Sequence, residues 1–364
     1  MPEPLEQLTQ HLNAAQTLAE PQVWQAVEQL ASENVSAGLK AGFLAALANK
    51  GETPEEIAAF ARALHDKSIQ PPLDAQTRAR EILDVVGTGG DRLSTFNIST
   101  TVAILCAAAG VTVAKHGNRA VTSSVGSADV IEALGMRMDL TPDEAARSLR
   151  EHNFAFFFAP NFHPAFKHIA PARKLCAARG QRTIFNILGP LLNPVHPSAL
   201  LVGVPRPELC EPMARALQSL GARRAMVVCG NAGSTVHSPQ SKAESDLAKS
   251  AIFLDELSTL GATHIAEFYQ ERGLAVSTLS PEDFPLQPAT LADLRGGDKV
   301  VNADIIRRIL RGDERVPMRD AVLLNAAASL FVADKAKSLA EGWELAAETI
   351  DAGKARAKLV ELAA

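Results

Sequence analysis

Asp84-Val-Val-Gly-Thr-Gly-Gly-Asp91, followed by Arg-Leu-Ser-Thr-Phe-Asn-Ile-Ser-Thr100, is the stretch that decides the fold. The apolar residues before Gly87 predict a buried strand, and the glycines predict a sharp turn in which the backbone can approach a ligand. A helix is expected to begin near Ser99. A strand, a glycine turn and a helix N-terminus together form an anion site, because free N–H groups and the positive end of the helix dipole converge there.

This turn differs from the two common phosphate-binding loops. The dinucleotide fingerprint requires glycine at the position of Arg92, and the P-loop requires a Gly-Lys-Ser/Thr triplet that does not follow here. An ordinary glycine-rich turn would explain the glycines alone equally well. Asp91 and the run Asn97-Ile-Ser-Thr100 favour a ligand site, since an acid among phosphate-binding amides usually accompanies a metal ion or a sugar hydroxyl.

Composition describes a globular protein of 364 residues, long enough for one large domain and a small one. The net charge of −5 and the pI of about 6.0 give no basic footprint for nucleic acid. The four cysteines lie far apart without a Cys-x-x-Cys pair, which is typical of reduced thiols in a cytoplasmic protein. We find neither a signal-peptide pattern nor the roughly 18 apolar residues of a membrane span, so no membrane partner is expected.

Residues 1–74 are predicted to form a helical domain. Thr53-Pro-Glu-Glu56 combines an N-cap, a proline at the first helical position and a capping-box glutamate, and apolar residues then recur at helical spacing. Gln70-Pro-Pro-Leu-Asp74 is the natural linker to a second domain, 75–364. An apolar stripe left over on the helices would suit a dimer surface, although core packing explains it equally well.

After the linker, short apolar runs alternate with helices, which predicts an α/β fold with a mostly parallel sheet. Helices are expected to begin at Thr141, with a second capping box, and to occupy 319–333 and 337–351. The polar segment 231–250 is expected to be a surface loop or insertion. The predicted strands are 82–86, 111–114, 154–159, 200–204, 225–229 and 274–279.

A second strand–loop–helix unit occupies 114–129 and carries Lys115, Arg119 and several hydroxyl groups. Two such anion sites in one domain suit a ligand with phosphate groups at both ends. The competing interpretation, a solvated basic turn, is weakened by the second glycine loop.

The adjacent acids Asp255 and Glu256 suit Mg²⁺, which prefers oxygen ligands and often shares them with substrate phosphates. The signal is weak alone, because the pairs at 282–283 and 313–314 look similar and most such pairs are solvated. Between His152 and Pro207, 56 residues contain no Asp or Glu, whereas 41 acids in 364 residues would give roughly 6. A stretch with basic residues and no acids is expected to face an anion.

Taken together, these motifs resemble the anthranilate phosphoribosyltransferase family. The resemblance runs in order from about residue 36 to the C-terminus. The related pyrimidine nucleoside phosphorylases share the architecture but have different loop sequences. The motifs that carry the resemblance are Gly-Thr-Gly-Gly-Asp91, Asn97-Ile-Ser-Thr100, Lys115-His-Gly-Asn-Arg119, Gly126-Ser-Ala-Asp129, Arg182-Thr-Ile-Phe-Asn-Ile-Leu-Gly-Pro-Leu-Leu-Asn-Pro194, Asp255-Glu256-Leu-Ser258 and Arg319-Asp-Ala-Val-Leu-Leu-Asn-Ala-Ala-Ala328.

The resemblance implies a helical domain completed by part of 163–185 and joined to an α/β domain of the nucleoside phosphorylase and phosphoribosyltransferase type. It implies a cytoplasmic homodimer formed through the helical domain. It also implies the tryptophan-pathway reaction in which phosphoribosyl pyrophosphate and anthranilate give N-(5-phosphoribosyl)anthranilate and pyrophosphate with Mg²⁺. No general base is expected, because the attacking aromatic amine is neutral at pH 7.

The resemblance also assigns residues to three groups. The phosphoribosyl donor would be held by Gly87, Gly90, Asp91, Thr95, Asn97, Ser99, Thr100, Lys115, Ser123 and Ser127. Mg²⁺ would be held by Ser99, Asp255 and Glu256. Anthranilate would face Asn118 and Arg173, with His116, Pro160, His163 and Phe166 lining its entry.

The chain departs from the family pattern at three places. The spacing after Arg173 is about three residues longer than usual, which leaves open whether Arg173 or Arg179 meets the carboxylate of the acceptor. Cys229-Gly230 replaces the usual His-Gly, and a polar stretch of roughly 20 residues then precedes Asp255. Two other functions remain open: a related phosphoribosyltransferase or phosphorylase with another aromatic acceptor, and a non-catalytic relative that binds nucleic acid.

Overall fold

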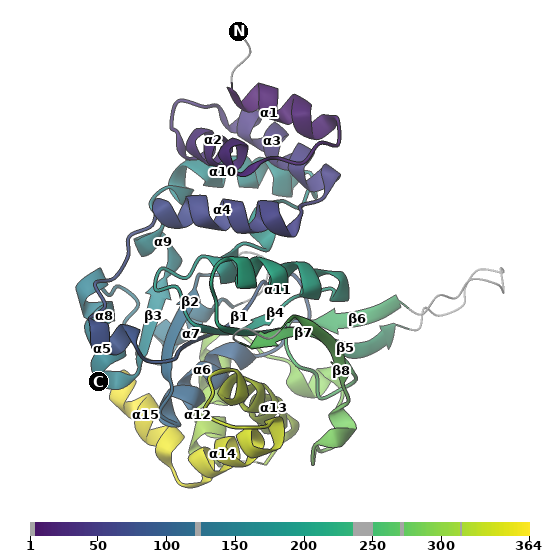
Figure 1. The fold of residues 1–364 in the computed structure, drawn as a ribbon. Coiled ribbons are helices and arrows are strands. Elements are labelled where there is room, and N and C mark those ends of the chain that lie inside the picture. Colours follow the sequence, from purple (N-terminus) through teal and green to yellow (C-terminus); the bar gives the residue numbers. More distant parts are fainter. Residues whose placement is uncertain (1–3, 121–124, 236–249, 270–272, 314) are drawn as a thin grey trace, which may run out of the picture.

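The computed structural model describes residues 4–120, 125–235, 250–269, 273–313 and 315–364. A helical part lies above an α/β part, with the N-terminus at the top of the helices and the C-terminus at the left-hand side of the α/β part (Figure 1). The helical prediction for the first part is confirmed. Its helices are α1 (Pro4–Asn13), α2 (Glu20–Ala31), α3 (Ala37–Lys50) and α4 (Pro54–Asp66), and the short α5 (Ala75–Arg78) follows the linker.

All the predicted signals for the N-terminus of α4 are present. Glu56 N donates to Thr53 Oγ1 at 3.2 Å, and Thr53 N donates to Glu56 Oε2 at 2.9 Å, which closes the capping box. The buried Glu56 carboxylate also accepts from Lys50 Nζ and from the Leu18 amide. One acid therefore anchors three segments of the helical part.

A helix from later in the sequence, α10 (Phe166–Ala178), joins this bundle by packing on α2 and α3 (Figure 1). Its docking is fixed by a buried lysine: Lys40 Nζ donates to Ser32 O at 2.6 Å and to His168 O at 2.8 Å. Burial lowers the pKa of Lys40.

The sheet has the strand order β3-β2-β1-β4-β5-β7-β8, with β6 paired to β5. The prediction of a mostly parallel sheet is confirmed, and the carboxyl ends of the first five strands meet at one edge. The parallel strands are β1 (Ile82–Gly87), β2 (Thr112–Gly117), β3 (Phe154–Phe158), β4 (Ala199–Gly203) and β5 (Arg224–Thr235). The antiparallel strands are β6 (Ser250–Leu254), β7 (Thr263–Tyr269) and β8 (Ala275–Leu279).

The sheet differs from the predictions in its strands β6 and β7, in the length of β5 and at the end of β3. β6 and β7 were not predicted, because their short runs mix polar and apolar residues and become strands by pairing with β5. Residues 231–235 continue β5 instead of forming a surface loop, whereas 236–249 lie outside the described residues. Ala159 begins α9 (Ala159–Phe162) and is not part of β3.

Helices cover both faces of the sheet, and the strand side chains alternate between two cores. Leu201 of β4 faces the core formed with α6 and α13, while Leu200 and Val202 face the core shared with α11 and the helical part. The helices of the α/β part are α6 (Ile98–Ala108), α7 (Ser127–Ala133), α8 (Pro142–His152), α11 (Cys210–Ser219), α12 (Lys299–Arg311), α13 (Pro317–Val332), α14 (Leu339–Asp351) and α15 (Lys354–Leu362). Among the described residues, no helix is long and apolar enough to cross a membrane.

Candidate functional site

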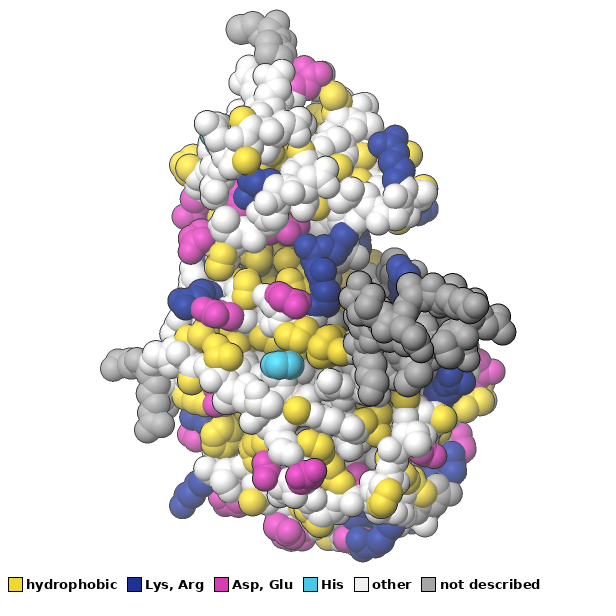
Figure 2. Space-filling model, turned by 90° about the vertical axis from the view of Figure 1, so that its right-hand side faces the viewer, with side chains coloured by type: hydrophobic (Ala, Val, Ile, Leu, Met, Phe, Trp, Pro, Cys, Tyr) yellow, Lys and Arg dark blue, Asp and Glu magenta, His cyan; other side chains and the backbone are white. Residues whose placement is uncertain are grey.

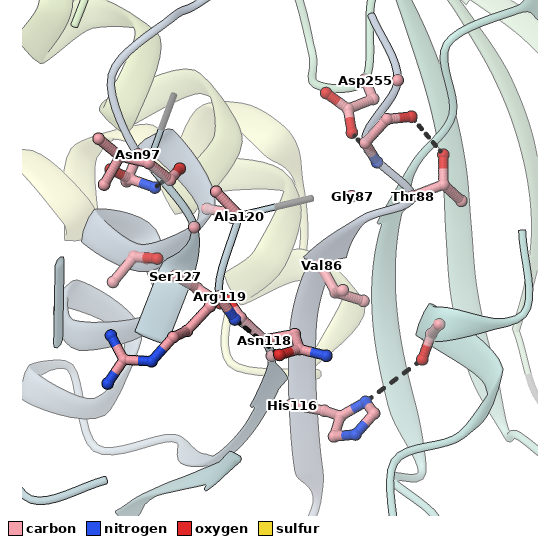
Figure 3. Close-up of a pocket in the computed structure, with 18 of the residues that line it drawn as sticks. Val86, Gly87, Thr88, Asn97, His116, Asn118, Arg119, Ala120, Ser127 and Asp255 are labelled. Carbon is pink, nitrogen blue, oxygen red and sulfur yellow. Dashed lines mark hydrogen bonds between the residues drawn. The ribbon is translucent and has the colours of Figure 1, made fainter. Parts of the chain in front are cut away.

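The carboxyl edge of the sheet, below the helical part, holds a pocket of about 340 Å³. In Figure 3, Gly87, Thr88 and Asp255 lie on one side of this pocket, whereas Asn97 and Ser127 lie on the other. The glycine turn after β1, the loop after β2, the acid pair and α10 all contribute to its lining. Segments far apart in the sequence thus meet around one cavity.

Glycines allow the acid pair to lie directly on the strand ends. A Cβ on Gly87 would lie 2.9 Å from Asp255 Cγ, and one on Gly203 would overlap the Asp255 carbonyl group. A Cβ on Gly230 would lie 2.6 Å from Glu256 O. β1 and β4 therefore each end in a glycine, β5 carries one within the strand, and all three glycines make room for the same loop.

Hydrogen bonds fix this acid loop from both sides. Gly89 N donates to Asp255 Oδ2 at 2.7 Å, which links the glycine turn to the acid pair. On the other side, Leu257 N donates to Asn325 Oδ1 at 2.9 Å, and Asn325 Nδ2 donates to Leu257 O at 3.0 Å. Asn325 lies on α13, inside the Arg319–Ala328 motif, and the sequence analysis gave it no role.

Three carboxylates crowd this side of the pocket. Burial and the charge of Asp91 raise the pKa of Asp255 to about 7. Burial and the charge of Asp255 raise the pKa of Glu256 well above its ordinary value, although Lys115 opposes the shift. Half-buried acids that repel one another are stabilised by a divalent cation.

The donor set fits Mg²⁺. Among the described residues, no three Asp, Glu, His or Cys side chains converge as a ready-made metal site. Mg²⁺ in phosphate-transferring proteins typically takes only one or two carboxylates and completes its shell with water and substrate phosphates. Asp255 and Glu256 are the two carboxylates, and the expected hydroxyl ligand Ser99 is close by, because its backbone amide contacts Glu256.

Lys115 is buried beneath the pocket floor. Its Nζ donates to Val85 O at 2.7 Å and to Ser99 Oγ at 3.4 Å. Burial lowers the pKa of Lys115, while the carboxylates of Asp84 and Glu256 oppose this shift. Its charge therefore helps to balance the acid pair as well as any bound anion.

Asp84 and Asn193 form a buried support that the sequence analysis missed. Asn193 Nδ2 donates to Asp84 Oδ2 at 2.9 Å and to Ala114 O at 2.6 Å, and His116 N donates to Asp84 Oδ1 at 3.4 Å. Burial raises the pKa of Asp84 to about 6. An acid inside the apolar run of a central strand was the signal available in the sequence, because such a charge is rarely buried without a function or a partner.

The loop after β2 differs from the glycine turn after β1. Asp129 Oδ2 accepts from Gly126 N at 2.9 Å and from Ala120 N at 3.1 Å, so two amides of this loop already have an acid as partner. Arg119 Nη1 lies 2.8 Å from Asp129 Oδ1, and Arg119 Nη2 lies 3.2 Å from Glu132 Oε1. The expectation that Arg119 is available for a phosphate is therefore weakened by its two carboxylate partners.

Aromatic rings and one arginine form the wall toward the helical part. The Arg173 guanidinium lies 5.4 Å from the centre of the Phe185 ring, and Phe166 meets Phe185 edge-on with centres 5.6 Å apart. His163 stacks on Phe166 at 5.2 Å and contacts His116 at the same centre separation. Burial lowers the pKa of Arg173.

The buried histidines are neutral. Burial, and then the neighbouring His163, lower the pKa of His116 to about 3, and burial lowers that of His163 to about 4. His116 Nδ1 donates to Gly189 O at 3.3 Å, and a backbone carbonyl can only accept, so Nε2 is left as an acceptor without a partner (Figure 3).

Most of the residues expected at the site line the pocket. Pro160 and His163 do not line it; Pro160 is exposed on α9, and His163 lies behind Phe166. Ser123 lies outside the described residues. The expected residues in the lining are Gly87, Gly90, Asp91, Thr95, Asn97, Ser99, Thr100, Lys115, His116, Asn118, Ser127, Phe166, Arg173, Asp255 and Glu256.

The long acid-free segment contributes less than expected. Of its basic residues, Arg173 lines the pocket, whereas Lys167, Lys174 and Arg179 are exposed. Helix geometry explains the difference, because side chains around α10 point in different directions and, of these basic residues, only Arg173 reaches the pocket. On the face shown in Figure 2, outside the grey atoms, basic and acidic side chains are interspersed and no continuous basic band crosses the surface.

Comparisons with known proteins agree with this arrangement. The glycosyl transferase family α/β domain matches residues 79–356, and the helical bundle domain of the same family matches residues 5–68. Anthranilate phosphoribosyltransferase of Geobacter sulfurreducens is 43% identical over 356 residues, covering 95% of this chain and 94% of the relative.

Two solved structures are similar over nearly the whole chain. The crystal structure of anthranilate phosphoribosyltransferase from Thermus thermophilus has a TM-score of 0.83 and 39% identity, covering 98% of both chains. The enzyme from Saccharomyces cerevisiae in complex with phosphoribosyl pyrophosphate and Mg has a TM-score of 0.82 and 27% identity, covering 98% of this chain and 96% of that one.

Proposed function

The chain belongs to the anthranilate phosphoribosyltransferase family, and from this we propose that it transfers the phosphoribosyl group of phosphoribosyl pyrophosphate to the amine of anthranilate in tryptophan biosynthesis. The observation that carries the proposal is a single cavity in which a glycine turn, a pair of half-buried acids and an arginine with aromatic neighbours converge. The first two suit a pyrophosphate with its metal ion, and the third suits an aromatic carboxylate.

The donor is assigned to the glycine-turn side of the pocket. Thr100 Oγ1 is buried without a partner in the pocket wall, at the start of α6. Positive φ angles at Gly89 and Gly90 turn this backbone sharply beside the cavity. The proposed donor residues are those implied by the resemblance: Gly87, Gly90, Asp91, Thr95, Asn97, Ser99, Thr100, Lys115, Ser123 and Ser127.

Mg²⁺ is assigned to Asp255 and Glu256 with the Ser99 hydroxyl. When bound, the ion neutralises charge on the leaving pyrophosphate. Gly89 holds the Asp255 carboxylate in place, and Asn325 holds the backbone that follows Glu256. The chain thus fixes both acids before any ligand arrives.

The acceptor is assigned to Arg173 and Asn118, with His116 and Phe166 along its entry. Pro160 and His163, which the resemblance also implies there, lie outside the lining. The Arg173 guanidinium can grip the carboxylate of anthranilate in a bidentate pair, while Phe185 holds the guanidinium plane. Arg179 ends α10 and is exposed outside the pocket lining, which favours Arg173 over the other open choice.

The reaction requires alignment more than proton transfer. As pyrophosphate leaves C1 of the ribose, positive charge develops at that carbon. The amine nitrogen forms the new C–N bond, and its proton then passes to water or to the released pyrophosphate. The amine is already neutral at pH 7, so the pocket needs no strong base. Neutral His116, with Nε2 free to accept, suits an amine N–H better than a cation would.

Loss of anthranilate fluorescence on addition of phosphoribosyl pyrophosphate, with and without Mg²⁺, tests the proposal. We expect rapid loss that requires both the donor and the metal ion. Turnover of another aromatic acceptor but not of anthranilate would assign the chain to a related transferase or phosphorylase. Salt-dependent retardation of nucleic acid in a gel, without turnover, would favour a binding protein.

The fold also bears on the domain division and the oligomeric state. We propose a division into a helical domain of residues 1–74, completed by part of 163–185, and an α/β domain of residues 75–364. We also propose a cytoplasmic homodimer formed through the helical domain. Light scattering of the purified chain should give twice the 38.6 kDa of one chain, and a monomer would refute the dimer.

A further inference from the structure

Asn302, in the first turns of α12, contacts the donor loop from outside the pocket. Its side chain is 1% exposed, and it is not among the residues that line the cavity. Asn302 Nδ2 donates to Asn97 Oδ1 at 2.9 Å, and Gly297 N donates to Asn302 Oδ1 at 2.7 Å. Asn302 therefore connects a fixed backbone amide to a side chain that does line the pocket.

The chemistry of these groups sets the orientation of both amides. The Gly297 N–H can only donate, so Asn302 must turn its oxygen toward Gly297 and its NH₂ group toward Asn97. Asn97 must then turn its own oxygen toward Asn302. The Asn97 NH₂ group is left for Val125 O, at 3.4 Å, and for the cavity.

Close packing keeps Asn302 against the donor loop. Phe96 N donates to Leu294 O at 3.0 Å, and Gly296 N donates to Ser94 O at 3.0 Å. A Cβ on Gly296 would lie 2.5 Å from Asn302 Oδ1. The segment that carries Asn302 is thus bound to the loop along its backbone, and glycine is required where the amide passes.

We propose that Asn302 is a positioning residue for the phosphoribosyl donor: it holds Asn97 with its NH₂ group turned toward the oxygen atoms of that ligand. This role rests on the proposed function, which assigns the donor to this wall of the pocket. An amide turned the other way would present its carbonyl oxygen to an anion and would weaken binding.

The test is Asn302→Asp, which keeps the volume and still accepts from Gly297. The new carboxylate would oppose the Asn97 oxygen, so the Asn97 amide should turn over. We expect the Kd of phosphoribosyl pyrophosphate, measured by calorimetry with Mg²⁺, to rise about tenfold. The KM for anthranilate should change less than about twofold, whereas equal changes in both constants would contradict a role specific to the donor.

A double-mutant cycle separates orientation from the added charge. In an Asn97→Ala background, Asn302→Asp should change the Kd of the donor less than about twofold, because the side chain through which it acts is gone. A tenfold rise that persists there would mean that the new charge acts directly on the donor, which would overturn the proposal. If Asn302→Asp proves unstable, Asn302→Ala should give a smaller rise that also disappears in the Asn97→Ala background.

Asp298→Ala is the matched control for the start of the helix. Asp298 Oδ1 accepts from Val300 N and Val301 N at 2.9 Å, so its loss should lower Tm through a missing N-cap and leave the Kd of the donor unchanged. An equal rise in Kd would show that Asn302 acts only through the stability of α12. A wild-type chain that binds the donor but leaves anthranilate untouched would refute the proposed acceptor chemistry and not this inference.

Discussion

The two halves of the pocket are built in different ways. The donor half consists mainly of backbone at strand ends, where glycines admit the Asp255 loop and the Gly89 amide binds the Asp255 carboxylate. The acceptor half consists of side chains from α10 and from the segment around Phe185, which meet the sheet only because the helical part folds over it. Backbone at a sheet edge is rigid. We therefore expect substitutions in the donor half to lower the rate of catalysis most, and substitutions in the acceptor half to change the binding of the acceptor.

The largest effect should follow removal of both acids from the donor half. Asp255→Asn combined with Glu256→Gln keeps the shape of the loop but removes the charges proposed to hold the metal ion. We expect kcat/KM to fall by about a thousandfold, because charge on the leaving group is no longer neutralised. A Mg²⁺ titration of the rate should become flat, and an unchanged titration would place the metal ion elsewhere.

The next largest effect should come from adding a single methyl group at the end of β4. In Gly203→Ala the Cβ would overlap the Asp255 carbonyl group, so the acid loop must move. We expect kcat to fall by about a hundredfold and the free energy of unfolding to fall by about 1–3 kcal/mol. Gly42→Ala in α3 is the control, because no atom lies within 4 Å of the added carbon; it should keep full activity.

The acceptor half should respond through substrate binding. Arg173→Ala should raise the KM for anthranilate by about thirtyfold and leave the KM for the donor nearly unchanged, because a charge-assisted pair with the carboxylate is lost. Arg179→Ala, on the exposed end of the same helix, should change neither constant. Steady-state kinetics with both substrates varied will measure this, and the reverse result would assign the carboxylate to Arg179.

The smallest effect should be on the pH dependence of folding stability, through the buried residue His65. Burial, and then the charge of His196, lower the pKa of His65 to about 3, and His65 Nε2 donates to Leu191 O at 2.7 Å. The unfolded chain therefore binds more protons than the folded one between about pH 3 and 6.5, so stability falls as the pH falls through that range. His65→Gln should remove at most about 1.4 kcal/mol per pH unit from this slope.

Urea unfolding at a series of pH values will measure that slope. His152, which is exposed on the surface and paired with Glu361, provides the control, since His152→Gln removes an imidazole that is not buried. Identical slopes for wild type and His65→Gln would contradict a buried neutral His65.

The sequence by itself determined the helical start, the α/β alternation and the donor half. Each depends on local spacing: the capping box at Thr53, the glycines around Gly87 and the hydroxyl residues in the first turn of α6 each act within a few residues of chain. The antiparallel strands β6 and β7 escaped prediction, because their pairing with β5 comes from distant residues.

Only the tertiary structure decided which buried residues support the pocket and which side chains form its acceptor wall. The sequence places Asp84 in an apolar strand but does not show its partners, and it gives no local sign that Asn193, Asn302 and Asn325 act as supports. The partners of all four lie 32 to 205 positions away and are revealed only by packing. Packing also separates Arg173, which lies in α10 and lines the pocket, from Arg179, which follows the last residue of that helix and is exposed. Local spacing fixes what a segment can bind, whereas burial of distant segments against one another fixes which atoms hold it in place.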